Sequence, residues 1–154
     1  MDDRVKPWVR IGIAVLAVPQ LLTGLWATLA TRSWWESYPG VGPDLVAALP
    51  PFNEHLASDA GAGFLATGVA LAIAAATGRR PHVDLALITF LAFTLPHTIH
   101  HATHGAPGLT GAEDLYAVGL LAGGVVLAAV LLVGAHRQDP RDVVSPADDV
   151  RASV

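Results

Sequence analysis

Histidines are the residues of this chain that could do chemistry, and most of them gather in one short segment. Four of the 7 histidines, His97, His100, His101 and His104, fall within eight positions. At about 100° per residue, these four side chains share one helical arc of about 100°. Imidazole nitrogens bind transition metals and transfer protons near neutral pH. The spacing therefore predicts a metal site on one face of a helix.

Carboxylates that could complete such a site stand near the starts of two other apolar segments. Asp59 follows His55 by four residues, so both are expected on the same side of a helix. Because ionisable groups below a membrane surface are costly, their presence indicates function. We expect a metal site built from residues of three helices: His55, Asp59, His97 and His101, with His100, His104 and Asp114 as further ligands or supporting groups.

The ligand set contains no thiolate, because the chain has no cysteine. Histidine and carboxylate ligands suit zinc, iron or copper, and the sequence does not choose among these divalent transition metals. If the protein is an enzyme, the metal is expected to activate water or oxygen, with Glu54 or Glu113 moving protons. A site near the membrane surface makes a lipophilic small molecule the natural substrate.

The composition of the chain indicates that lipid surrounds much of it. Its 154 residues are 53% hydrophobic and only 14% charged, with a mean hydropathy of +0.50. An average soluble domain carries about 25% charged residues. This composition argues against an ordinary soluble enzyme, and a net charge of −4 without a basic face argues against nucleic acid as a partner.

Four apolar segments are long enough to cross a bilayer, which takes about 20 helical residues. They are predicted at about 8–31, 53–77, 84–102 and 112–135. The fold class expected is therefore all-α, a four-transmembrane-helix bundle formed by residues 1–136. Residues 137–154 are rich in Asp, Pro and Arg, and we expect them to form a disordered cytoplasmic tail.

The basic residues predict the orientation of the bundle in a cell membrane. Eight of the 9 Lys and Arg residues lie before or at the start of the first span, between the second and third, or after the fourth; Arg32 is the exception. Basic residues in short loops stay on the cytoplasmic side. Both termini are therefore expected in the cytoplasm, and the histidines near the outer surface of a multi-pass protein.

Several other features lead to smaller expectations. Trp34 and Tyr38 are expected to anchor the chain at the outer interface, and Gln20 to hydrogen-bond between helices. Small residues that follow Asp59, Gly61 among them, predict close helix packing. The apolar segment 39–52 is expected to cover the site, with a short interfacial helix that starts at 42–44.

Short motifs in the second and third spans carry a resemblance to known proteins. They are Phe52-Asn53-Glu54-His55, Asp59-Ala60-Gly61-Ala62, Leu95-Pro96-His97 and His100-His101. With the four spans, these motifs resemble small four-helix bacterial integral membrane proteins that are DoxX-like in topology. The group His97, His100 and His101 also resembles one histidine box of the membrane di-iron desaturases and hydroxylases, which carry three.

Three further functions stay open at this point. A haem-binding electron-transfer protein would use two axial histidines and leave the other histidines without a role. A metal or proton carrier would need a polar route through the inner half of the bundle. A structural subunit of a membrane complex, or a homo-oligomer, would use the helices mainly for assembly.

Overall fold

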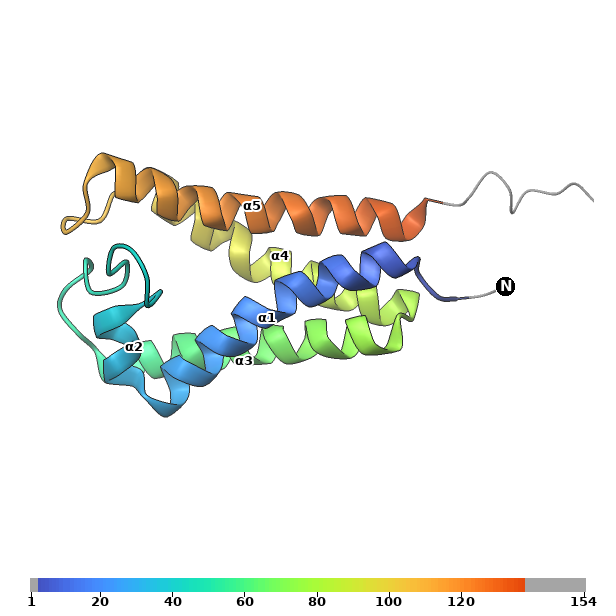
Figure 1. The fold of residues 1–154 in the computed structure, drawn as a ribbon, viewed down its shortest axis with the longest axis horizontal. Coiled ribbons are helices and arrows are strands. Elements are labelled where there is room, and N and C mark those ends of the chain that lie inside the picture. Colours follow the sequence, from blue (N-terminus) through green and yellow to red (C-terminus); the bar gives the residue numbers. More distant parts are fainter. Residues whose placement is uncertain (1–2, 138–154) are drawn as a thin grey trace, which may run out of the picture.

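The computed structural model describes residues 3–137, which form five α-helices and no strand-built sheet. Figure 1 shows four long helices lying roughly along one axis, with a short helix at one end. In chain order the helices are α1 (Pro7–Leu29), α2 (Thr31–Ser37), α3 (Glu54–Thr77), α4 (Arg80–Thr103) and α5 (Gly111–His136).

All four long helices are long and apolar enough to span a membrane, so the prediction of an all-α, multi-pass membrane protein is confirmed. Two helix ends differ from the predicted ones by more than one residue. The first span ends at Leu29, because the chain turns at Ala30 into α2. α4 begins at Arg80 because Pro81 occupies its first turn, where proline needs no hydrogen bond from its nitrogen. The predicted tail at 138–154 lies outside the described residues.

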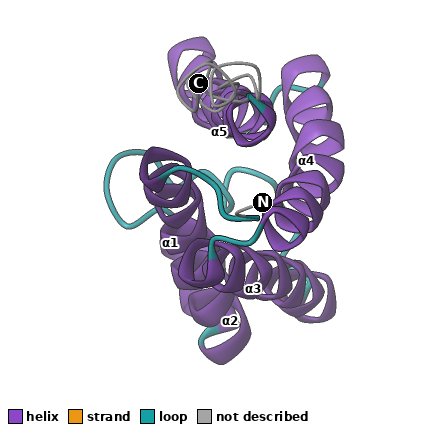
Figure 2. Cartoon of the chain, turned by 90° about the vertical axis from the view of Figure 1, so that its right-hand side faces the viewer, coloured by secondary structure: helices purple, strands orange, loops and turns teal. Residues whose placement is uncertain are grey.

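The long helices follow one another around the bundle in the order α1, α3, α4, α5, and α1 also packs against α5 (Figure 2). The start of α1 and the end of α5 lie together, at what we call the terminal end. There the N-terminal segment pairs with the α3–α4 turn, since Val5 N donates to the Gly78 carbonyl at 2.9 Å. The opposite end, which carries α2, is called the α2 end. Four spans place both termini on one side; that this side is the cytoplasm stays a prediction.

Glycines bring α1 and α3 into close contact. A Cβ added at Gly68 would lie 2.8 Å from the backbone nitrogen of Leu21, and one at Gly61 would lie 2.8 Å from the Cβ of Ala27. Residues this small let helix backbones approach closely enough for van der Waals packing to hold them. The close packing predicted for the residues after Asp59 is confirmed at Gly61, with α1 as the partner.

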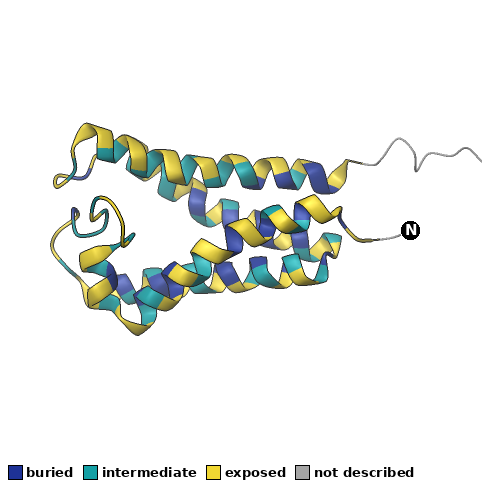
Figure 3. Cartoon of the chain, viewed as in Figure 1, coloured by how far each residue is buried: buried dark blue, intermediate teal, exposed yellow. Residues whose placement is uncertain are grey.

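Burial differs between the two ends of the bundle: at the α2 end the cluster of buried apolar residues comes from α1, α2 and α3, without α5 (Figure 3). One apolar core joins all four long helices near the termini, and it contains Ile13, Leu71, Leu87 and Leu131. Every buried residue of α5 lies at Ala128 or beyond. The first half of α5 is therefore at most half-buried. Apolar side chains exposed along the middle of the helices are left for lipid to cover.

Arg10 joins α1 to the end of α3. Its Nε donates to the Ala75 carbonyl at 2.9 Å and its Nη2 donates to the Ala76 carbonyl at 3.0 Å. These carbonyls belong to the last turn of α3, where intrahelical partners run out. We expect Arg10→Ala to lower the free energy of unfolding by about 1.5–3 kcal/mol, the range for hydrogen bonds that involve a charged group. Chemical unfolding in detergent, followed by circular dichroism, measures this, and a midpoint equal to that of the wild type would contradict it.

Candidate functional site

A cavity of about 230 Å³ lies inside the α2 end of the bundle. All four long helices contribute to its wall, together with α2, the segment that follows it and the α4–α5 loop. The lining is mostly apolar, with a few polar side chains. The residues that line the cavity are Pro19, Gln20, Thr23, Trp34, Tyr38, Leu45, Val46, Leu49, Ala60, Phe64, His97, His101, Ala106, Leu109, Ala117, Leu120 and Leu121.

Two of the predicted site residues, His97 and His101, belong to this wall. They lie one turn apart on α4, and their ring centroids are 4.7 Å apart with the rings edge to face. Phe93 stacks on His97 at 6.2 Å, and Phe64 of α3 meets the same ring edge-on at 6.5 Å. These aromatic contacts hold the His97 ring at the cavity wall. Both imidazoles are half-buried.

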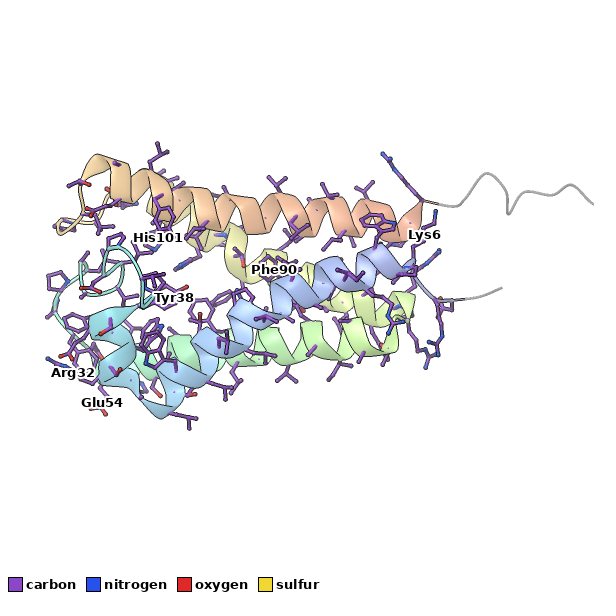
Figure 4. All side chains as sticks on the ribbon, viewed as in Figure 1. Lys6, Arg32, Tyr38, Glu54, Phe90 and His101 are labelled. Atoms are coloured by element: carbon purple, nitrogen blue, oxygen red, sulfur yellow. The ribbon has the colours of Figure 1, made fainter. Side chains whose placement is uncertain are left out.

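Tyr38 is the third titratable residue that lines the cavity. It lies just after α2, and Figure 4 shows Tyr38 and His101 on the inner side of the α2 end, whereas Glu54 lies at its outer edge. The Tyr38 ring packs 5.9 Å from the Trp34 ring. Trp34 is only 6% exposed. The expectation that Trp34 and Tyr38 are interfacial anchors is therefore wrong: α2 folds back and turns both inward.

The segment 38–53 covers the cavity, as its apolar character predicted, but it does so without the expected short helix. Gly40 and Gly42 adopt positive φ angles of 89° and 84°, which only glycine adopts readily, and they turn the chain back on itself. The turn is closed by the Leu45 nitrogen, which donates to the Tyr38 carbonyl at 2.9 Å. Leu45, Val46 and Leu49 reach the cavity from this segment.

Two polar atoms in the residues of the cavity wall are buried without a hydrogen-bond partner. They are Oε1 of Gln20 and Nε1 of Trp34. The interhelical hydrogen bond expected of Gln20 is not made by this oxygen. A buried polar group without a partner costs about 1–3 kcal/mol. A few polar side chains in the wall of an apolar cavity are typical of a binding site.

His55 and Asp59 lie outside the cavity. Their side chains are 89% and 63% exposed, and they face each other at 3.4 Å, between Nε2 of His55 and Oδ2 of Asp59. The residues of α3 that line the cavity are instead Ala60 and Phe64. At about 100° per residue, Asp59 points about 100° away from Ala60 and His55 about 140° away. The predicted ligands of α3 are therefore not brought to His97 and His101.

His100 and His104 form a second pair at the end of α4. Their rings stack with centroids 4.7 Å apart, and both residues are exposed. His104 Nδ1 lies 2.9 Å from the Thr103 hydroxyl. The His100 ring is 5.9 Å from the His101 ring. The pair therefore adjoins the cavity residues without lining the cavity.

The remaining predicted carboxylates have structural partners. Asp114 accepts a hydrogen bond from the Ala106 nitrogen at 3.1 Å and ties the α4–α5 loop to α5. Glu113 accepts from both the nitrogen and the hydroxyl of Thr110, each at 2.8 Å, in a capping box. Glu54 is exposed in the first turn of α3, where a negative charge stabilises the helix.

Between residues 3 and 137, no three His, Asp or Glu side chains come together in a group that could hold a metal ion. The seven-residue metal site thus stays a prediction, of which the cavity contains His97 and His101. The wall residues Gln20, Trp34 and Tyr38 were not predicted from the sequence as part of the site. Polar and amphipathic side chains in or beside an apolar span were the signal that could have found them.

Comparison of the chain with models of known protein families, with curated proteins and with solved structures gives no match.

Proposed function

We propose that this protein binds a small, largely apolar molecule inside the membrane, in the cavity at the α2 end, with a polar group of that molecule held by His97 or His101. The observation that carries the proposal is the pairing of an apolar cavity of about 230 Å³ with two imidazoles in its wall. Ligand sites are typically apolar hollows with a few convergent polar groups.

The size and chemistry of the cavity narrow the ligand. An apolar cavity of about 150 Å³ in another protein binds benzene. The larger volume here suits one substituted ring or a short branched chain. A neutral imidazole carries one donor and one acceptor nitrogen, so it suits a hydroxyl or a carbonyl group. Imidazole also takes up and returns protons near neutral pH, which makes proton exchange with a bound hydroxyl the reaction open to this site.

4-Bromophenol tests the binding function, because bromine quenches tryptophan fluorescence and Trp34 lines the cavity. In lipid nanodiscs we expect a saturable quenching component in the wild type. Ala117→Phe fills the cavity and should abolish that component. Ala112→Phe, on the same helix at an exposed position outside the cavity, should keep it. Quenching that rises linearly with concentration in the wild type would contradict the proposal.

Bromobenzene, the same ring without the hydroxyl, tests the role of the histidines. A net hydrogen bond contributes about 0.5–1.5 kcal/mol, so after correction for partitioning into lipid we expect 4-bromophenol to bind about 2–13 times more tightly. This preference should disappear in the double variant His97→Leu and His101→Leu. Equal affinities of the wild type for both ligands would exclude the histidines as the polar contact.

A bound transition metal is the second candidate function. The observation in its favour is that His97 and His101 stand one turn apart and face the same cavity, with 4.7 Å between ring centroids. Two imidazoles leave coordination positions for water or for the ligand itself, as a catalytic metal requires. The carrier alternative has less support, because apolar side chains fill the terminal half of the described bundle.

Placement of the cavity on the extracytoplasmic side, in a cell membrane, is part of the same proposal and is supported by the basic residues at the terminal end. The likeness to DoxX-like proteins in topology, a homo-oligomeric state and membership of a larger complex stay predictions.

A further inference from the structure

The cavity is closed at the α2 end by two segments that are joined to each other. The Gly108 nitrogen of the α4–α5 loop donates to the Ala48 carbonyl of the segment 38–53 at 3.3 Å. A Cβ at Gly108 would lie 2.9 Å from the Ala48 Cα, so the two backbones touch. Asp114 holds the neighbouring Ala106 nitrogen at 3.1 Å, and both Ala48 and Ala106 are buried. These contacts form a roof between the cavity and the water beyond.

On the side toward lipid, α1 and α5 pack tightly near the terminal end. A Cβ at Gly12 of α1 would meet the side chain of Leu131, which is 1% exposed. One turn further along α5, a Cβ at Gly134 would meet the Trp8 ring. Leu131 and Gly134 therefore mark the face of α5 that is turned toward α1.

The same faces separate nearer the α2 end. Leu120 precedes Leu131 by eleven residues, so at about 100° per residue it lies about 20° from Leu131 around α5. Pro19 follows Gly12 by seven residues and lies about 20° from it around α1. Yet Leu120 is 54% exposed, Pro19 is also exposed, and both line the cavity. The contact between α1 and α5 that Leu131 makes near the terminal end is therefore absent at Leu120, and the two helices leave an opening there.

The depth of this opening places it in hydrocarbon. Leu120 lies nine residues after Gly111, or about 14 Å along α5 at 1.5 Å per residue. The hydrocarbon core of a bilayer is about 30 Å thick, so an opening at this depth faces lipid tails. Only a molecule dissolved in the bilayer meets it.

We propose that the ligand of this cavity is a lipid-soluble molecule that enters and leaves sideways from the bilayer, through a mouth between α1 and α5 bordered by Pro19 and Leu120. The inference rests on the proposed function, because it needs a ligand in the cavity. It adds the class of ligand and its route, and it predicts that the roof does not open during binding.

A reversible plug at Leu120 tests the route. The chain has no cysteine, so Leu120→Cys carries a single thiol, which benzyl methanethiosulfonate modifies in detergent before reconstitution into nanodiscs. We expect the stopped-flow rate of 4-bromophenol quenching to fall at least tenfold after modification. Release of the benzyl group by a reductant should restore the rate, which separates a blocked mouth from a misfolded variant.

Leu115→Cys is the matched control, because Leu115 is 73% exposed on the same helix and does not line the cavity. Its modification should leave the rate unchanged. An unchanged rate in modified Leu120→Cys, with saturable quenching intact, would overturn the lateral route and leave the binding function standing. If the wild type shows no saturable quenching, both the binding function and the lateral route are wrong.

Discussion

Gly24→Val is expected to yield protein that is largely unfolded or aggregated in mild detergent, the largest effect of any single substitution considered for this bundle. A Cβ at Gly24 would lie 2.7 Å from the Cα of Leu65, closer than real Cβ contacts come. The obstacle is backbone rather than a flexible side chain, so the helices α1 and α3 would have to separate. Overpacking of this kind costs about 3 kcal/mol at the upper end of its usual range.

The effect reaches the cavity, because α1 and α3 both contribute to its wall. The midpoint of unfolding in a urea or SDS titration, followed by circular dichroism, measures the loss. Gly123→Val is the matched control: a Cβ at Gly123 of α5 meets no atom within 4 Å. We expect Gly123→Val to unfold at about the wild-type midpoint. Equal midpoints for both variants would show that the α1–α3 contact does not limit stability.

Elemental analysis of protein purified with a tag that contains no histidine should show whether a bound metal depends on the cavity histidines of α4 or on His55 and Asp59 of α3. If the second candidate function holds, His97→Ala and His101→Ala should each lose nearly all bound zinc, iron or copper, since each removes one of two cavity imidazoles. His55→Ala and Asp59→Ala should keep the metal, because both side chains are mostly exposed and lie outside the cavity.

Loss of metal in His55→Ala as well would support the three-helix ligand set predicted from the sequence. It would require α3 to turn in the membrane relative to α1. Folded wild-type protein without metal would exclude the metal function and leave binding of an apolar molecule as the function to test.

The four spans and the shared face of the α4 histidines could be predicted from the sequence, because both depend only on residues within one helix. Apolar length determines the spans, because a backbone in lipid must satisfy its own hydrogen bonds. Helical periodicity determines that His97 and His101 share a face. It equally determines that His55 and Asp59 pair with each other, at 3.4 Å.

Helical periodicity does not predict how one helix is rotated about its axis relative to the next. Whether the His55 face or the Ala60 face of α3 turns inward depends on which side of α3 packs best against α1. Gly61 and Gly68 settle this, because the absence of a Cβ lets the α1 backbone come close on that side alone.

The way α2 folds back over the bundle could not be predicted either, because it depends on contacts between residues that are distant in the sequence. Trp34 and Tyr38 look like interfacial residues in a linear chain, and they become cavity residues only when Ala30 ends α1 and the glycines of the segment 38–53 turn it inward. Apolar length and helical periodicity therefore predict four membrane helices and one face of imidazoles. Which surface this face lines could not be predicted from them, because the cavity lies where neighbouring helices are not in contact, and contact between helices depends on how they pack together.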